Sequence, residues 1–420
     1  MQGTCGGNRR RFLKTTAAAG ATLAATRPAW ADEPEVGAAP PAEDEVKVPT
    51  VTLGKTGQQV TKLGMGTSWA LSPSFVQAAL VSGVRYIDTS ESYENRRAEQ
   101  VVGQVLERTG LRKDTYLVTK NSKFRGVANP AQSFRDELEG SLERLRTDYV
   151  DAYYIHGISA KQGGFEILRD PAVKAVFEEF KKAGKIRFCG FSCHDEALPE
   201  LLDLGAEVGW LDQVMIQYNF RARGVDHDKL QRAIDKASKA NLGLVAMKTQ
   251  RGADAIVEAV ENRRDLFEID RTLQQLREAG VKKELAAIKS VWADDRMQVV
   301  VSEMTNFSEL RENVAASRET LSLKEARLLE EHRRATAHLY CHGCGHLCET
   351  AAKGVPVATV LRYLRYYASY GKRQEARALY QALPAEARNL AQADLEAAEQ
   401  ACPHGLPIVQ LVHHADKHLA

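Results

Sequence analysis

The chain has 420 residues and nearly balanced charge, with 57 Lys and Arg against 55 Asp and Glu and a formal net charge of +2. This balance gives no electrostatic reason to expect a nucleic-acid partner, which a marked excess of basic residues would indicate. The length suffices for one large α/β domain and a smaller second module.

The N-terminal segment has the organisation of an export signal. Arg9 and Arg10 precede a mildly apolar, Ala-rich stretch, and residues 28–31 supply a small-x-small cleavage site. We therefore expect a twin-arginine signal peptide over residues 1–31, recognised by the twin-arginine export machinery, and a periplasmic or otherwise exported protein. The apolar stretch is too short for a membrane span, and a disordered basic tail is the alternative. Residues 32–50, rich in Ala, Pro and acidic residues, are expected to form a flexible linker.

Beyond this point apolar runs alternate with helical patterns. A short hairpin is predicted at residues 51–60, and helices that begin near a proline are predicted at 130–145 and 171–183. An inserted helix is expected at 271–279, inside a connection too long for an ordinary crossover. Eight apolar runs are typical of buried parallel strands, near residues 63–67, 84–88, 115–120, 149–156, 186–192, 212–217, 242–247 and 298–302. Alternation with eight strands predicts an α/β fold of the (β/α)8 TIM-barrel type rather than an open sheet.

Four polar residues stand at or just beyond strand ends: Asp88, Tyr93, Lys120 and His156. In a closed parallel barrel, chemistry takes place at the carboxyl ends of the strands. A neighbouring Lys ammonium favours a tyrosine phenolate and so eases proton donation. Asp88 would pair with Lys120 and keep it charged, and His156 would orient a substrate oxygen. The set predicts a general-acid site for a carbonyl group, although any one of these residues alone is equally typical of a polar strand end.

The segments that carry these residues resemble the aldo-keto reductase family. Residues 83–93 look like the family's Asp-to-Tyr signature, and residues 117–120 and 154–156 look like its Lys and His segments, in the same order and at similar spacing. The resemblance covers about residues 51 to 318. It implies a TIM barrel, which we place at residues 51–325, together with a nicotinamide cofactor and carbonyl reduction.

By the same resemblance, cofactor contacts fall at the later strand ends. The family's Ser and Gln at two of these ends hold the nicotinamide carboxamide, with a hydroxyl and an amide as partners. Two positions depart from the family: Cys193 stands where Asn usually follows the Ser, and Met247 stands where many relatives stack an aromatic ring. The predicted cofactor-binding residues are Gly66, Thr67, Ser192, Gln217, Met247, Lys248, Ser302 and Asn313.

The expected phosphate end departs further from the family. Glu303 replaces a Gly, and Thr305 replaces an Arg that would pair bidentately with a 2′-phosphate. Glu312 and Asn313 match the family's adenine-side pair. We expect NADP(H) as the cofactor and keep NAD(H) as an alternative, because a carboxylate in this loop weakens the preference for the phosphorylated dinucleotide.

Four of the seven cysteines lie in the C-terminal tail. Cys341, Cys344 and Cys348 have C-x2-C-x3-C spacing, and Cys402 follows after a long interval with a proline behind it. Three close thiolates with a remote Cys-Pro suit an iron–sulfur site. These four cysteines are the predicted metal ligands.

An internal echo supports this interpretation. Residues 351–357 repeat the form of residues 402–408, with Ala where the second copy has Cys-Pro. The pattern looks like a two-motif ferredoxin-type module that has lost one ligand, and some aldo-keto reductases resemble this in carrying such an extension. We expect a helical module over residues 326–420 that holds a [4Fe–4S] cluster. The alternatives are a zinc site that uses the four cysteines, or three of them with His342 or His346, and disulfides or vestigial thiols.

A run of tyrosines in this tail has helical spacing and is expected to form a packing surface: Tyr363, Tyr366, Tyr367 and Tyr370. The whole chain is thus predicted to be an exported NAD(P)-dependent oxidoreductase that acts on a small carbonyl or alcohol substrate, with Tyr93 as general acid/base. A redox-active cluster would add a redox partner. The alternative is a noncatalytic or electron-transfer barrel protein with weakened dinucleotide binding.

Overall fold

The computed structural model of the chain describes residues 48–69, 72–222 and 228–420. The predicted signal peptide and nearly all of the predicted linker lie outside these residues, so both stay predictions. The domain boundaries at 325 and 326 likewise stay predictions, because helices continue across that position.

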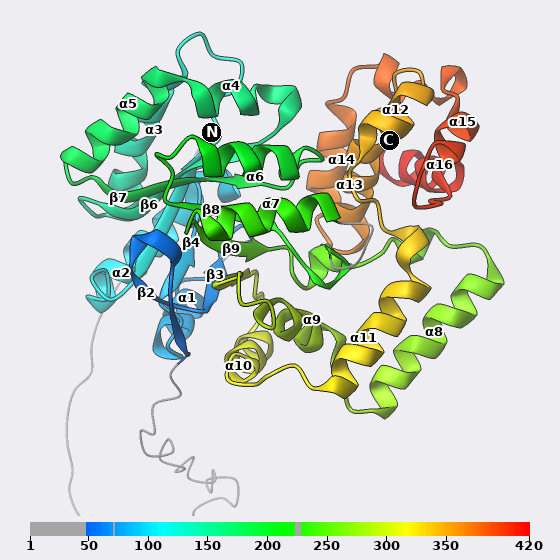
Figure 1. Ribbon diagram of the computed structural model, residues 1–420, viewed down its shortest axis with the longest axis horizontal. Coiled ribbons are helices and arrows are strands. Elements are labelled where there is room, and N and C mark those ends of the chain that lie inside the picture. Colours follow the sequence, from blue (N-terminus) through cyan, green and yellow to red (C-terminus); the bar gives the residue numbers. More distant parts are fainter. Residues whose placement is uncertain (1–47, 70–71, 223–227) are drawn as a thin grey trace, which may run out of the picture. The chain divides into compact units, whose positions relative to one another are not determined.

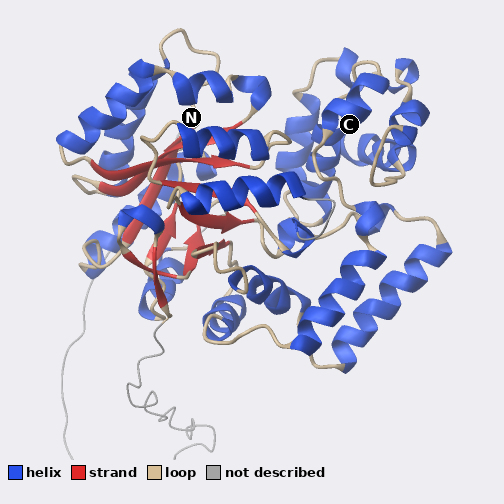
Figure 2. Cartoon of the chain, in the orientation of Figure 1, coloured by secondary structure: helices blue, strands red, loops and turns tan. Residues whose placement is uncertain are grey.

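Eight parallel strands close into a barrel, which confirms the predicted fold class (Figures 1 and 2). Around the barrel their order is β10-β3-β4-β5-β6-β7-β8-β9, so each strand pairs with its sequence neighbours and the last closes on the first. Each strand lies within two residues of the predicted bounds. The strands are β3 Leu63–Gly66, β4 Tyr86–Asp88, β5 Tyr116–Asn121, β6 Val150–Ile158, β7 Ile186–Cys193, β8 Gln213–Gln217, β9 Gly243–Met247 and β10 Val299–Ser302.

Helices follow the strands and bury one face against them. Four of the described helices begin with a proline in the first turn, and in three of them the side chains of Ser72, Asn129 and Asp170 each accept a hydrogen bond from a backbone N–H of that turn. These caps explain why the predicted starts at 130 and 171 are confirmed. The helices of this layer are α1 Pro73–Val81, α2 Arg97–Thr109, α3 Pro130–Leu145, α4 Gly164–Arg169, α5 Pro171–Lys182, α6 Leu198–Glu207, α7 Asp228–Lys239, α9 Lys283–Trp292 and α10 Phe307–Ala316.

A hairpin closes the amino-terminal end of the barrel. Its strands are β1 Thr50–Thr52 and β2 Gln59–Thr61, paired antiparallel. Leu53 and Val60 belong to the apolar cluster that fills the barrel interior. A Cβ on Gly243, the first residue of β9, would lie 2.8 Å from the Leu53 side chain. The opposite, carboxyl end of the barrel is therefore the one left for chemistry.

The long connection after β9 contains an additional helix. This helix, α8 Arg263–Glu278, begins earlier than the predicted 271–279, because the Asn262 side chain caps it by accepting from the Arg264 N–H. It packs against α11 Leu323–Ala335. In Figure 1 the two helices lie side by side.

The C-terminal residues form a helical module with an apolar core of its own. Its helices are α12 Gly345–Ala351, α13 Val357–Ala368, α14 Arg373–Gln381, α15 Leu395–Gln400 and α16 Ile408–Leu419. The echoed segments have equivalent places: Pro356 precedes α13 and Pro407 precedes α16. Because α12 packs against α15 and α13 against α16, the echo in sequence corresponds to two similar halves. Within the described part of the chain, no helix combines the length and apolar character needed to cross a bilayer.

A buried histidine joins the two added helices. His332 on α11 is 5% exposed, and its Nδ1 lies 3.0 Å from the Thr272 hydroxyl on α8. Burial, with the nearby charges of Lys283 and Arg221, lowers the pKa of His332 from 6.5 to about 3. The folded protein therefore keeps this imidazole neutral.

This histidine predicts an acid-sensitive stability. The unfolded chain takes up a proton near its ordinary pKa, whereas folded His332 does so only near about 3. Its contribution is therefore complete above about pH 6.5 and is lost as the pH falls towards about 3; near pH 4.5 the loss is about 2–3 kcal/mol. Urea unfolding across this range should show His332→Gln flattening the pH dependence, while exposed His413→Gln leaves it intact. An unchanged slope for His332→Gln would contradict the assignment.

Candidate active site

The alternation of side chains along three neighbouring strands brings the predicted catalytic residues together. Along a strand, every second residue faces the same side. Tyr86, Val118 and Tyr154 face the barrel interior. The residues two positions further on are Asp88, Lys120 and His156, so they also face inward, at the carboxyl end where the interior opens.

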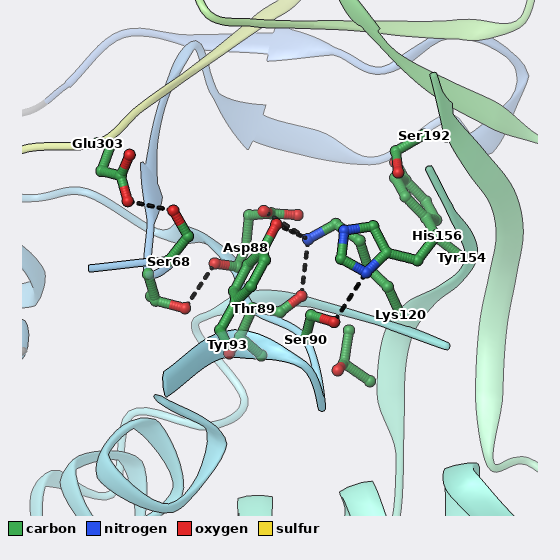
Figure 3. Close-up of polar contacts among 12 residues, drawn as sticks. Ser68, Asp88, Thr89, Ser90, Tyr93, Lys120, Tyr154, His156, Ser192 and Glu303 are labelled. Atoms are coloured by element: carbon green, nitrogen blue, oxygen red, sulfur yellow. Dashed lines mark hydrogen bonds and ion pairs between the residues drawn. The ribbon is translucent and has the colours of Figure 1, made fainter. Parts of the chain in front are cut away.

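The four side chains are in contact around one ammonium group (Figure 3). Lys120 Nζ donates to Asp88 Oδ1 at 2.6 Å and to the Thr89 carbonyl at 2.7 Å. It also lies 3.2 Å from Tyr93 Oη. The ring of Tyr93 meets that of His156 edge-on, with the ring centroids 5.5 Å apart. The structure therefore assembles an acid, an amine, a phenol and an imidazole at one point.

Burial controls the protonation of Tyr93. The sequence predicts that Lys120 favours the phenolate, but burial, followed by the carboxylates of Asp88, Glu303 and Glu91, raises the pKa of Tyr93 well above its ordinary value. This corrects the expectation, since desolvation of the phenolate outweighs the stabilisation by one ammonium. Tyr93 thus keeps its proton at neutral pH.

The ion pair beside Tyr93 is also set by burial. Desolvation raises the pKa of Asp88 and lowers the pKa of Lys120, and each partner's charge opposes the effect on the other. Glu303 raises the pKa of Asp88 further. One carboxylate oxygen, Asp88 Oδ2, has no hydrogen-bond partner among the described residues.

His156 is held neutral and fixed in orientation. Burial, followed by the positive charges of Lys120 and Arg125, lowers its pKa well below the ordinary value. Its Nδ1 lies 3.0 Å from the Ser90 hydroxyl. A neutral imidazole has one donor nitrogen and one acceptor nitrogen, so the contact with Ser90 leaves the other nitrogen available to a ligand.

The backbone just after Tyr93 is strained. Glu94, Asn95 and Arg96 have φ values of 47°, 57° and 74°. Left-handed conformations cost a non-glycine residue about 1–3 kcal/mol each and concentrate at functional sites. Three in succession hold the short turn Tyr93–Arg96 in the shape that presents the Tyr93 ring to Lys120.

The tetrad opens into a cavity of about 1290 Å³. All of the predicted catalytic residues line it, and so do all of the predicted cofactor-binding residues. Residues of the C-terminal module complete its wall, among them Arg362, Tyr366 and Tyr370. A single chamber thus joins the tetrad to the strand ends assigned to the dinucleotide.

Comparison with known proteins decides the family. The family model described as the aldo/keto reductase family matches residues 62–334. The chain belongs to the aldo/keto reductase family. Membership indicates an NAD(P)-dependent oxidoreductase built on this barrel.

Individual relatives of this aldo/keto reductase agree at moderate identity. The chain is 30% identical to aldo-keto reductase YhdN of Bacillus subtilis over 207 residues, 44% of the chain and 58% of that protein. It is 25% identical to the uncharacterized oxidoreductase YqkF of the same organism over 306 residues, 67% of the chain and 95% of that protein. A crystal structure of an aldo/keto reductase from Klebsiella pneumoniae in complex with NADP and acetate matches with a TM-score of 0.51 and 25% identity, covering 69% of the chain and 95% of that structure.

In this aldo/keto reductase the nicotinamide-end candidates are tied into the protein. The hydroxyl of Ser192 accepts a hydrogen bond from the Gly157 N–H at 2.8 Å. The Gln217 side-chain amide donates to Tyr340 Oη at 3.0 Å. Tyr340 belongs to the segment that leads into the C-terminal module, so sequence comparison within the barrel does not identify it. At this end the module directly positions a barrel residue.

A polar network occupies the predicted phosphate end. Ser302 Oγ donates to Gln250 Oε1 at 2.7 Å, and Asn313 Nδ2 donates to Ser302 Oγ at 3.0 Å. Gln250 in turn donates to Asn313 Oδ1 at 3.1 Å. The sequence predicts Ser302 and Asn313 but not Gln250, which enters from the long connection after β9.

An arginine from the same connection lies beside the predicted phosphate loop. Arg251 Nη2 donates to Glu309 at 2.6 Å and to the Thr305 hydroxyl at 3.2 Å. Arg251 is thus adjacent to the position at which Thr305 replaces the family's Arg. In the sequence, the unusual length of this connection is the only sign that its side chains reach the site. Strand and helix patterns do not predict where the side chains of an irregular connection lie.

Three of the four predicted metal ligands pack in the core of the module, where Cys348 is buried and Cys341 and Cys402 lie against it. Burial has the largest effect on the Cys348 thiol and raises its pKa. The neighbouring Cys341, Glu349, Cys344 and Cys402 raise it further, to about 12. All six described cysteines are free of disulfides. However, no three described His, Cys, Asp or Glu side chains are grouped closely enough to hold a metal ion. Four thiols are the right number and type of ligand for an iron–sulfur cluster. Their spacing in this structure does not fit the cluster.

Proposed function

We propose that this aldo/keto reductase reduces a small carbonyl compound with NADPH, and oxidises the corresponding alcohol in the reverse direction. The observation that carries the proposal is the buried contact of Lys120 with both Asp88 and Tyr93 at the head of the cavity. A bound reduced nicotinamide would supply a hydride to the carbonyl carbon. The remaining chemistry belongs to residues of the chain.

In this proposal Tyr93 donates the proton. As the carbonyl carbon gains the hydride, the π-electron pair moves to the oxygen, which takes the proton from Tyr93 Oη. The phenolate that forms lies 3.2 Å from Lys120 Nζ, and a charge-assisted hydrogen bond stabilises it. Asp88 keeps Lys120 charged and in place. His156 donates a hydrogen bond that orients the substrate oxygen.

Removal of the phenol tests this role. Tyr93→Phe should lower kcat for carbonyl reduction by at least about 100-fold, because a general acid contributes about 10²–10⁴-fold. Dinucleotide affinity, measured by fluorescence titration, should be unchanged. Tyr367→Phe is the matched control, since it removes a hydroxyl from the same protein outside the cavity lining. Full activity in Tyr93→Phe would exclude it as the acid.

The noncatalytic alternative is less favoured. Family membership and a tetrad whose members are in contact both support an enzyme. A barrel that had lost its chemistry would have no reason to retain a buried ammonium beside a phenol, because burial of a charge is costly unless it is used or well paired.

We further propose that the preferred dinucleotide is NADP(H). The Klebsiella pneumoniae relative is in complex with NADP, and Arg251 offers a guanidinium next to Thr305, where the sequence alone suggests that no arginine is available. A guanidinium pairs bidentately with phosphate. Glu309 would share Arg251 with the 2′-phosphate.

The proposed role of Arg251 predicts a change in cofactor preference. Arg251→Gln should raise the Kd for NADP(H) by about 10- to 100-fold, the usual range for one charge-assisted hydrogen bond. The Kd for NAD(H) should stay within about 2-fold, and the control Arg311→Gln, an exposed residue on α10, should change neither. An equal loss for both dinucleotides would place Arg251 away from the 2′ position.

We propose a [4Fe–4S] cluster on Cys341, Cys344, Cys348 and Cys402 as a structural group of the module, and assign it no step in the reaction. Support comes from the packing of Cys341, Cys348 and Cys402 in one apolar cluster, from the absence of disulfides at the described cysteines, and from the two-fold echo of the helices around them. The thiols would have to move closer together to bind it.

Metal analysis tests the cluster. Anaerobically purified protein should contain about four iron and four sulfide per chain, and Cys402→Ala should lose them and lower the thermal midpoint of the module. Cys189→Ala, a buried cysteine of the barrel, should keep the iron. Zinc without iron, or a full complement of metal in Cys402→Ala, would refute the cluster.

A further inference from the structure

Helix α13 of the C-terminal module supplies part of the wall of the catalytic cavity. Arg362, Tyr363 and Tyr366 from this helix all line the cavity that contains Tyr93 and His156. Tyr366 lies near enough to Tyr93 that its charge contributes to raising the pKa of that phenol. The module therefore reaches the place where the substrate's carbonyl group would be bound, and its side chains are in position to contact the remainder of a substrate.

A lysine on the barrel side meets this helix. Lys248 directly follows β9 and has a φ of 58°, a left-handed conformation that is unusual for lysine. Its Nζ lies 3.4 Å from Tyr366 Oη and 5.2 Å from the centre of that ring. Strained backbone of this kind persists where the surroundings hold it in place. Here it directs a cation towards the module.

Lys248 and Arg362 carry charges that no described carboxylate neutralises. Neither forms an ion pair within the described residues; the polar contacts of Arg362 are a 3.4 Å hydrogen bond to Thr359 and a 5.8 Å approach to the Tyr363 ring. Both cations act on His194, whose pKa they lower. The buried Nδ1 of His194 lacks a hydrogen-bond partner in the described part of the chain.

Most acidic residues of the cavity are engaged elsewhere. Glu375 pairs with Lys372 at 3.4 Å, Glu196 pairs with Lys161 at 3.8 Å, and Asp195 accepts from the Ala160 N–H. Glu303 is bonded to Ser68. The side of the cavity formed by α13 and the end of β9 therefore has two cations, a phenol and an imidazole, with no anion of the protein bound to them. Such a set attracts an anionic oxygen group.

We propose that Arg362, Lys248 and Tyr366 form a subsite for an anionic oxygen group, a carboxylate or a phosphate, on the carbonyl substrate. The inference rests on the proposed function, because it assigns the far end of the molecule that Tyr93 reduces. The Arg362 guanidinium is the specificity-determining group, since its planar fork matches either anion. The substrate class is then an aldehyde or ketone that carries an acid group, rather than a neutral sugar or apolar aldehyde.

Matched pairs of substrates test the subsite. One pair is 4-carboxybenzaldehyde and its neutral amide, which have the same shape; the other is glyceraldehyde 3-phosphate and glyceraldehyde. The full-length protein should show a kcat/KM at least about 10-fold higher for the acid of each pair. Arg362→Gln should remove about 10- to 100-fold of that preference by raising KM for the acid, the usual range for a charge-assisted hydrogen bond, and should leave the neutral partner unchanged. Arg362→Lys should restore part of it.

The control variant is Arg373→Gln, which removes an exposed arginine of the same module outside the cavity lining. It should leave both pairs unchanged. A preference for only one pair would identify the anion as carboxylate or phosphate. Equal kcat/KM within both pairs, or an equal loss for acid and neutral partner in Arg362→Gln, would overturn the subsite.

A binding measurement separates this result from failure of the proposed function. Calorimetric titration with the non-reducible analogues 4-carbamoylbenzoate and terephthalamide, which differ in one carboxylate only, needs no turnover when NADP is saturating. The acid should bind at least about 10-fold more tightly, and Arg362→Gln should abolish the difference. Anion binding without any turnover would contradict the proposed reductase activity and support the subsite. Turnover without a preference for the anion would support the activity and contradict the subsite. Weaker NADP binding in Arg362→Gln, with acid binding unchanged, would assign the cations to the dinucleotide and refute the proposal.

Discussion

The site depends on one buried ammonium group. Lys120 is 0% exposed, and a charge in that position is tolerated only when its hydrogen bonds are satisfied. Its partners come from the end of β4, the following carbonyl and the turn that holds Tyr93. Correct placement of these partners requires the β4–β5 register in which Asp88 lies opposite Val118. A shift by one residue would turn Lys120 outward.

Burial, rather than this ammonium, sets the charge state of the neighbouring groups. Burial makes every charged form costly, so Tyr93 and His156 stay neutral while Asp88 and Lys120 balance each other. A neutral phenol next to an ammonium can donate its proton, and the ammonium is already in position to stabilise the phenolate that forms. The turn after Tyr93, with three successive left-handed residues, holds the phenol beside the ammonium.

The C-terminal module is part of the site rather than an appendage. Tyr340 bonds to Gln217, Lys372 donates to the Ser68 carbonyl at 3.2 Å, and Tyr366 meets Lys248. Tyr370 lies so close to Gly252 that a Cβ there would be 2.4 Å from its hydroxyl. Because these contacts fall on three different barrel loops, loss of order in the module would disturb both the dinucleotide end and the substrate end of the cavity.

The module also changes the interpretation of its tyrosines. Their helical spacing predicts a packing surface, and Tyr363, Tyr366 and Tyr367 do pack against the module core. Tyr363, Tyr366 and Tyr370 also line the cavity. One face of this helix packs on the module core and another face lines the cavity. The sequence of the helix does not predict which surface the second face contacts.

Local pattern determined much of this protein. Apolar runs specify the strands, and proline and capping residues specify helix starts. The order Asp88, Tyr93, Lys120, His156 predicts that these residues meet, because parallel strands of one barrel end at a common face. The strands and helix starts are set by residues close together in the sequence, and the meeting of the four residues follows from the closure of one sheet. The tertiary structure alone decided the pKa of Tyr93, the approach of Arg251 to Thr305 and the cationic wall made by Lys248 and Arg362. Each of these depends on burial or on contacts between segments far apart in the chain, for which spacing along the sequence has no information.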